Sequence, residues 1–292
     1  MSALETPRAA GASPVLGITG STGRIGGRVA RLLADAGATQ VLLARTPSRA
    51  PALPGATVRA CSYEDTPASR EALSGLDALF MVSASESAER LAQHLAFVEA
   101  ARAVGVPRIV YLSFQGASPD ATFTLARTHA ATEEAIRASG MTWTFLRDSF
   151  YLDFFADLVG EDGVIRGPAG NGRCGAVAID DVARVAAAVL LDLDAYEGRT
   201  LDLTGPEALT MDEVAAVISR VEGREVSFHD ETVEEAYEFR KRWPAPQWQY
   251  DAWVSTYTAI RNGELALVTR DVEEATGRAP LGLEDVLRNR RA

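Results

Sequence analysis

The chain has 292 residues, of which 47% are hydrophobic and 24% charged, and 29 basic residues stand against 40 acidic ones, a formal net charge of −11. This length suffices for a large buried core, and no apolar run approaches a membrane span. An acidic surface repels phosphate backbones, which argues against nucleic acid as a partner. The two cysteines, Cys61 and Cys174, show no metal-ligand spacing and no disulfide framework, so we expect no metal and a reducing, cytoplasmic location.

Residues 1–14 lack the apolar segment of a secretory signal, and we expect a disordered tail there. From residue 15, short apolar runs alternate with helical patterns. The runs predict strands at 15–19, 40–44, 57–60, 78–82, 108–113 and 142–147. Helices are predicted at 24–36, from 66 onward, at 86–104 and near 126–139. Alternation at this spacing predicts βαβ crossovers and a parallel sheet that is covered on both faces.

After residue 150 the pattern changes. Residues 163–175 are rich in turn formers, and 176–191 read as a short strand followed by a helix capped by Asp180 or Asp181. A strand at 200–203 precedes a capping box that starts at Thr210, and the remainder is mostly helical and aromatic. The predicted fold is α/β, a doubly wound parallel Rossmann sheet (15–155 and 176–204) with a smaller, mostly helical C-terminal substrate lobe (156–175 and 205–292).

Three glycines, Gly20, Gly23 and Gly26, lie where the first strand ends and the first helix begins. They permit a tight turn, a close approach of the backbone to a pyrophosphate, and close packing of the helix on the strand. We therefore predict a dinucleotide site that also includes Ser21, Thr22, Arg24 and Ile25.

The end of the second strand selects the dinucleotide. An NAD site places an acidic residue there, whereas this chain has Arg45. A guanidinium pairs with a 2′-phosphate, and Arg24 could add a second contact. The sequence favours NADP(H).

Seven segments together resemble the NmrA-like, or atypical short-chain dehydrogenase/reductase, family. They are "ITGSTGRIG" (18–26), "LLART" (42–46), "VRACSYED" (58–65), "LFMVSASE" (79–86), "VPRIVYLSFQGA" (106–117), "THAATEEAIRASGMTWTFLRDSFYLDF" (128–154) and "IDDVARVAAAVL" (179–190). The resemblance implies that Ser62 and Tyr63 lie beside adenine and that Phe150 and Tyr151 line a substrate pocket. Members include quinone oxidoreductases, dye reductases and non-catalytic redox sensors.

The usual Tyr-x-x-x-Lys pair of short-chain reductases is absent, because Lys241 is the only lysine. We therefore predict hydride transfer from NADPH to a flat, conjugated small molecule, such as a quinone, an enone, an imine or a dye, whose reduction tolerates protonation by solvent. The alternative is a non-catalytic NADP(H)-binding sensor that acts through a protein partner. The oligomeric state is left open, a homodimer included.

Ser113 ends the fifth strand at the ligand-binding edge of the sheet and is a candidate for contact with substrate or nicotinamide, or simply a strand-end cap. Tyr151 is the main candidate for a hydroxyl near the substrate. His129 is a weaker candidate for catalysis, because a surface pair with Glu133 at i,i+4 explains it better. We expect Tyr111 in the core.

Asp148 is expected to fix Arg147 or to cap the next helix, not to act as an acid. Three residues that end the fourth strand could face the pyrophosphate or ribose: Ser83, Ala84 and Ser85. The other candidates for the substrate pocket are aromatic, and their rings could stack on a flat substrate or pack the lobe: Phe114, Trp243 and Trp248.

Overall fold

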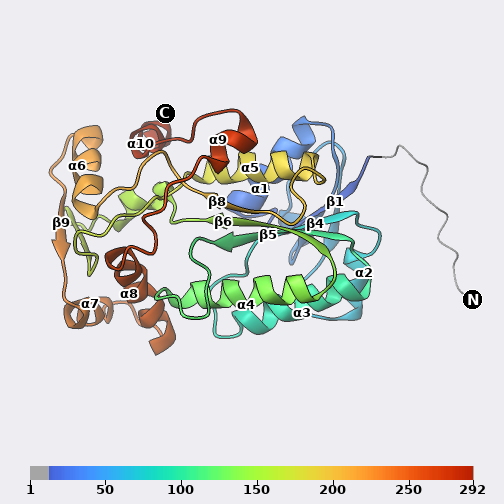
Figure 1. Cartoon of the computed structure of the whole chain (residues 1–292), viewed down its shortest axis with the longest axis horizontal. Coiled ribbons are helices and arrows are strands. Elements are labelled where there is room, and N and C mark those ends of the chain that lie inside the picture. Colours follow the sequence, from blue (N-terminus) through green and yellow to red (C-terminus); the bar gives the residue numbers. More distant parts are fainter. Residues whose placement is uncertain (1–12, 292) are drawn as a thin grey trace, which may run out of the picture.

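The computed structural model describes residues 13–291, so the predicted tail lies outside the described residues except for its last two. Its centre is a seven-stranded, all-parallel sheet with the strand order β3-β2-β1-β4-β5-β6-β8 (Figure 1). The strands are β1 (Val15–Ile18), β2 (Thr39–Ala44), β3 (Ala56–Ala60), β4 (Ala78–Met81), β5 (Arg108–Phe114), β6 (Thr142–Asp148) and β8 (Thr200–Leu203). The order reverses between β1 and β4, which is where ligands bind in such sheets.

Helices cover both faces of the sheet. On one face lie α1 (Arg24–Asp35) and α5 (Ile179–Leu191), and on the other α2 (Pro67–Leu73), α3 (Arg90–Ala103) and α4 (Thr124–Ala138) (Figure 1). Each face has its own apolar core, because the central strands are buried on both sides. This arrangement confirms the predicted doubly wound fold.

The C-terminal part adds a second layer at the carboxyl end of the sheet. It contains the 3-10 segment η2 (Leu152–Leu158), the helices α6 (Met211–Glu222), α7 (Val233–Arg240), α8 (Gln247–Arg261), α9 (Asp271–Thr276) and α10 (Leu283–Arg291), and a third apolar core. The predicted capping box is present, since Thr210 and Glu213 cap α6 reciprocally. Val272 of α9 is buried in the α1–α5 core, so part of this stretch packs back on the sheet.

Two strands were not anticipated. β7 (Val164–Gly167) lies within the segment predicted to consist of turns, and it pairs in parallel with β9 (Ser227–Asp230). Each is only four residues long and mixes polar with apolar side chains, so neither shows a strand pattern by itself.

Three local predictions were wrong. The short strand expected from residue 176 is only an isolated bridge between Val177 and Tyr151. The helix expected from residue 86 begins at Arg90. The N-cap of α5 is Ala178, and Asp180 and Asp181 lie in its first turn. The Ile179 N–H is instead bound by Asp153 at 2.9 Å, a partner 26 residues earlier in the chain that local capping rules could not identify.

Candidate functional site

The glycine loop between β1 and α1 has the shape of a phosphate cradle. Gly20 has a φ of +61°, and a Cβ on Gly26 would lie 2.4 Å from the Gly20 carbonyl oxygen. Gly23 is the N-cap of α1, which has no capping side chain and no acid in its first turn. The Ser21 hydroxyl is buried and has no hydrogen-bond partner among residues 13–291. Free helix N–H groups and an orphaned hydroxyl fit the pyrophosphate of a dinucleotide.

At the end of β2, Arg45 is exposed, and its guanidinium makes no ion pair with another described residue. Arg45 lies near Tyr63: burial raises the pKa of the Tyr63 hydroxyl, and the positive charge of Arg45 opposes that effect. This free cation at the edge of the cradle fits a 2′-phosphate.

Tyr63 and Ser62, which the resemblance placed beside adenine, already have partners in the structure. The Tyr63 hydroxyl lies 2.8 Å from the Thr19 hydroxyl and within hydrogen-bond reach of the Val82 carbonyl, so its one proton is shared between these acceptors. Its ring stacks on Phe97 with centroids 4.3 Å apart. Ser62 donates to Glu64 at 2.8 Å. Tyr63 can therefore offer a ligand its ring edge more readily than its hydroxyl.

The loop after β4 is anchored to α3. The Ala84 N–H donates to His94 Nε2 at 2.8 Å, and its carbonyl accepts from Arg90 at 3.0 Å. Ser83 is half-buried and Ser85 is exposed, and both residues follow the carboxyl end of β4, the neighbour of β1 at the point where the strand order reverses.

His129 lies inside the protein, and the expected surface pair with Glu133 is wrong. His129 is 5% exposed, its Nδ1 lies 2.9 Å from the Tyr111 hydroxyl, and its Nε2 accepts from Arg90 at 2.8 Å. Burial holds the pKa of His129 well below its usual value and, with Arg90, lowers that of His94 to about 3. Both imidazoles are neutral supports, while Tyr111 lies in the core as predicted but also bonds through its hydroxyl.

Ser113 is also committed to an internal network. It is fully buried, and its hydroxyl donates to Glu133 at 2.6 Å. Arg147 donates hydrogen bonds of 2.8 and 2.7 Å to the same carboxylate, and Arg137 donates a further hydrogen bond of 3.0 Å. Because Glu133 joins α4 to β5 and β6, this network fixes the ends of the two strands. Neither Ser113 nor His129 lines the large cavity at the carboxyl end of the sheet.

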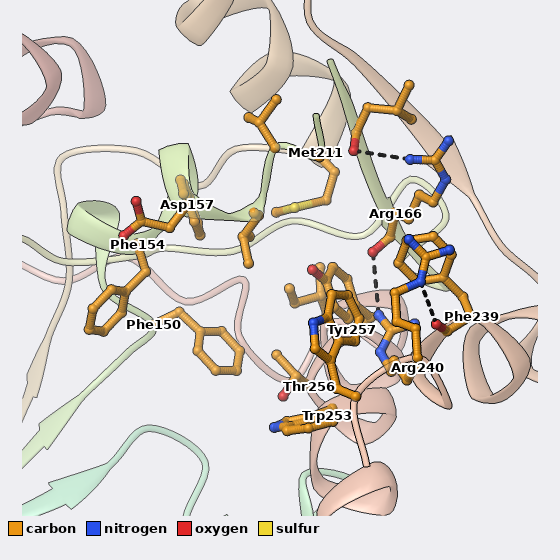
Figure 2. Close-up of a pocket in the computed structure, with 18 of the residues that line it drawn as sticks. Phe150, Phe154, Asp157, Arg166, Met211, Phe239, Arg240, Trp253, Thr256 and Tyr257 are labelled. Carbon is orange, nitrogen blue, oxygen red and sulfur yellow. Dashed lines mark hydrogen bonds between the residues drawn. The ribbon is translucent and has the colours of Figure 1, made fainter. Parts of the chain in front are cut away.

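A cavity of about 1220 Å³ opens between η2, β7, α7 and α8 (Figure 2). Of the predicted substrate residues, Phe150, Tyr151 and Trp243 line it, whereas Phe114 and Trp248 do not. Phe114 instead packs on Phe123 and Phe150, with centroids 5.0 and 5.4 Å apart. Trp253 and Tyr257, which lie in the aromatic stretch 243–257 that the sequence offered for stacking, also line the cavity. Further wall residues that sequence reasoning missed include Phe154, Phe155, Phe239 and three arginines.

Tyr151 is tied to a buried acid. Its hydroxyl donates to Asp148, which ends β6 and is 4% exposed. Burial raises the pKa of Asp148 to about 8, so this carboxyl is largely protonated near neutral pH. The expectation that Asp148 fixes Arg147 or caps the next helix was wrong, because Arg147 binds Glu133 and the N-cap of η2 is Tyr151, which has no side-chain cap.

Arg24 connects the cradle to the cavity. Its guanidinium carbon lies 4.8 Å from the centroid of the Phe154 ring, which lines the cavity. The glycine loop and the cavity are therefore neighbours. Arg24 faces the cavity wall, so its contact with a 2′-phosphate stays a prediction.

Residues 13–291 contain neither a membrane-spanning helix nor a metal-binding cluster. No helix there is long and apolar enough to cross a bilayer. No cluster of three or more His, Cys, Asp or Glu residues in the same stretch could hold a metal ion.

Several known proteins similar to this chain are named reductases or oxidoreductases. A (4-alkanoyl-5-oxo-2,5-dihydrofuran-3-yl)methyl phosphate reductase of Streptomyces griseus is 36% identical to this chain. The match covers 89% of this chain and 92% of that protein. Quinone oxidoreductase 2 of Escherichia coli is 34% identical over 74% of this chain and 77% of its own. The crystal structure of the E. coli NADPH-dependent quinone oxidoreductase QOR2 with NADPH superposes with a TM-score of 0.87 at 28% identity, covering 95% of this chain and 100% of that one.

These names agree with the predicted class of enzyme, an oxidoreductase. The model of the NmrA-like family matches residues 13–241, well over half of the sequence. The predicted resemblance is thereby confirmed, and the chain belongs to the NmrA-like family.

Proposed function

We propose that this protein is an NADPH-dependent reductase of a flat, conjugated small molecule. The observation that carries the proposal is the aromatic cavity that begins beside the cradle, where Arg24 contacts Phe154 and Tyr151 follows the end of β6. A reducing cofactor and a stacking pocket then share one edge of the sheet, as hydride transfer requires.

The cofactor would be held by residues of the first two strand ends. The loop from Gly20 to Gly26 and the N-terminus of α1 would bind the pyrophosphate, and Arg45 would bind the 2′-phosphate. When bound, NADPH supplies the hydride.

Two features favour a conjugated acceptor. Rings from η2, α7 and α8 present flat apolar surfaces to the cavity, which suits stacking. The similar proteins reported above are named for a quinone and for a 5-oxo-2,5-dihydrofuran that bears an alkanoyl group, and both are conjugated. Such acceptors take a hydride at one end of the conjugated system and a proton at the other.

The pair of Asp148 and Tyr151 can supply that proton. Tyr151 lines the cavity, and in the reacting complex its O–H would turn from Asp148 toward the reduced acceptor. It would pass its proton there while the protonated Asp148 donates its own proton to the Tyr151 oxygen. Solvent then restores the proton on Asp148, so one hydride and one proton reach the acceptor in each turnover.

Purified protein mixed with NADPH and a panel of quinones, enones, imines and dyes tests the proposal. We expect NADPH oxidation with at least one class, and a fall in kcat of about 100-fold for Tyr151→Phe, as for the loss of a general acid. Tyr196→Phe removes a hydroxyl outside the cavity and serves as the matched control. Tight NADPH binding without turnover of any acceptor would instead favour the sensor alternative.

The role of Asp148 has its own readout. In the wild type, kcat should fall above about pH 8, as Asp148 loses its proton. Asp148→Asn keeps the size of the side chain but cannot release a proton, so its kcat should be low and independent of pH in that range. If Asp148→Asn shows the same dependence of kcat on pH as the wild type, Asp148 takes no part in the proton transfer.

A further inference from the structure

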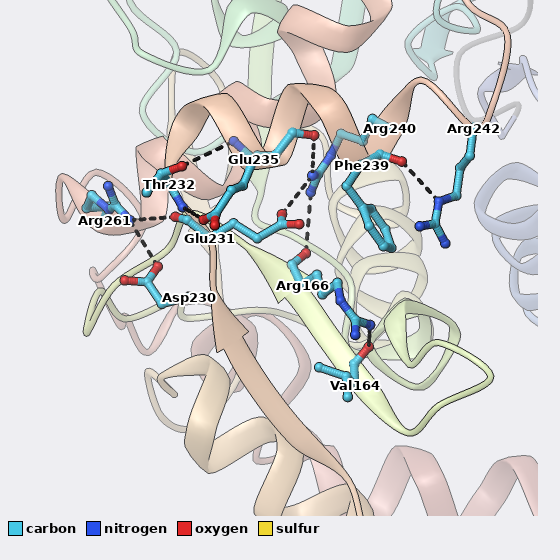
Figure 3. Close-up of polar contacts among 11 residues, drawn as sticks. Val164, Arg166, Asp230, Glu231, Thr232, Glu235, Phe239, Arg240, Arg242 and Arg261 are labelled. Carbon is cyan, nitrogen blue, oxygen red and sulfur yellow. Dashed lines mark hydrogen bonds and ion pairs between the residues drawn. The ribbon is translucent and has the colours of Figure 1, made fainter.

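Three arginines line the cavity, and Figure 2 shows two of them, Arg166 and Arg240, at the end away from Phe150 and Phe154. Arg166 comes from β7, Arg240 is the last residue of α7, and Arg242 follows α7 (Figures 2 and 3). We call this region the arginine end. A conjugated ring system at Tyr151 would not fill a cavity of about 1220 Å³, because pockets for drug-sized ligands usually measure roughly 300–1,000 Å³.

Two of these arginines are neutralised by carboxylates. Arg166 binds Asp162 through contacts of 3.0 and 2.5 Å. Arg240 binds Glu231 at 3.0 Å, and these two side chains are 7% and 3% exposed.

The buried pair also fixes the geometry of the arginine end. Arg240 donates to the main-chain carbonyl of Arg166 at 3.3 Å and to that of Ala236 at 2.9 Å, so it joins α7 to β7 (Figure 3). A buried ion pair is costly to desolvate and contributes little stability by itself, which makes positioning the better explanation of its presence.

Arg242 is different, because its guanidinium is held in place but keeps an open side. Its Nε donates to the Phe239 carbonyl at 3.0 Å, and its guanidinium carbon lies 3.6 Å from the Phe239 ring centroid and 5.5 Å from that of Trp243. Among residues 13–291, neither terminal nitrogen of Arg242 has a hydrogen bond or an ion pair. The edge formed by the two free terminal nitrogens of this planar guanidinium matches a carboxylate or a phosphate.

The acids around the cavity do not neutralise Arg242. Asp162 is bound to Arg166, and Asp157 is bound to Arg290 at 2.5 Å. Glu86 and Glu161 also line the cavity, but neither lies within ion-pair distance of Arg242. The neighbouring Lys241 is bound to Glu238 at 2.5 Å.

We propose that Arg242 binds an anionic group, a phosphate or a carboxylate, at the far end of a substrate whose conjugated part lies at Tyr151. This subsite rests on the proposed function, because it assumes that the cavity holds the hydride acceptor. The aromatic wall would bind the conjugated part of the substrate, and the Arg242 guanidinium would bind the anionic group at its other end.

The test uses 1,4-naphthoquinones that carry alkyl chains of graded length, each ending in a carboxylate, a phosphate or the neutral methyl ester. With the wild type, one chain length should give an anionic compound with a KM well below that of its ester. Arg242→Gln should raise the KM of that compound roughly 10- to 100-fold and leave that of the ester unchanged. Arg242→Lys keeps the positive charge but loses the planar guanidinium. Its KM for that compound should therefore lie between those of the wild type and Arg242→Gln.

Lys241→Gln is the matched control, because it removes a neighbouring positive charge that already has a partner. Equal effects of Arg242→Gln on acid and ester, or no preference of the wild type for any anion, would overturn the subsite. The carboxylate and phosphate series show which anion fits better.

The subsite can fail separately from the reductase function. Calorimetric binding of the same compounds to the NADPH-loaded protein reports on Arg242 even if none of them is reduced. Reduction of acid and ester with equal KM would retain the reductase and remove the subsite. Arg242-dependent binding without reduction would retain the subsite and exclude these quinones as acceptors, and turnover of the wider acceptor panel then decides the reductase function.

Discussion

The proton on Asp148 should make the stability of this protein fall as the pH rises. The folded pKa is about 8, because burial disfavours the carboxylate, whereas the unfolded value is about 3.9. Between these values the folded state binds more protons than the unfolded state, so the free energy of unfolding decreases as the pH rises through this window. With 1.36 kcal/mol per pKa unit, the loss due to this one group between pH 5 and pH 8 is about 3 to 4 kcal/mol.

The assay compares urea unfolding of the wild type and of Asp148→Asn at pH 5 and at pH 8. The variant cannot ionise at this position, so its stability relative to the wild type should rise by about 3 kcal/mol from the lower pH to the higher. Asp120→Asn changes an exposed loop carboxylate and should show no such trend. A difference between wild type and Asp148→Asn that stays constant with pH would refute the conclusion that the buried acid keeps its proton.

Three further predictions concern the cradle and its support. Gly26→Ala should abolish NADPH binding in a fluorescence titration, because the new Cβ would lie 2.4 Å from the Gly20 carbonyl oxygen; tight binding would show that the loop can shift. Arg45→Ala should weaken NADPH at least tenfold and NADH little, and equal losses would remove Arg45 from the choice of dinucleotide. Glu133→Gln should cost about 2 kcal/mol in urea unfolding, because Arg147 loses its charged partner; an unchanged midpoint would contradict this.

Local patterns predicted most of the fold. The strand from Ala78 to Met81 is wholly apolar, as expected of a parallel strand buried on both faces, and the glycine spacing marked the turn after β1. β7 and β9 escaped prediction because each is short and becomes a strand only by pairing with the other across more than 60 residues. A partner so distant leaves no periodic signal in either segment.

The candidate site also has parts that the sequence predicted and parts that it did not. The cradle from Gly20 to Gly26 and the position of Arg45 depend on one strand, one turn and the next strand, so the sequence by itself determined them. The roles of polar side chains depend on which elements meet. His129 and Glu133 lie one helical turn apart, yet each bonds to groups brought by other elements.

The sequence alone therefore determined that a parallel sheet carries a dinucleotide cradle suited to NADP(H), because these features are local. Only the tertiary structure decided that Tyr151 hydrogen-bonds to the buried, protonated Asp148. It also decided that the terminal nitrogens of Arg242 face the cavity without a partner among the described residues. Burial and the pairing of charges decide both, and both are properties of segments packed together.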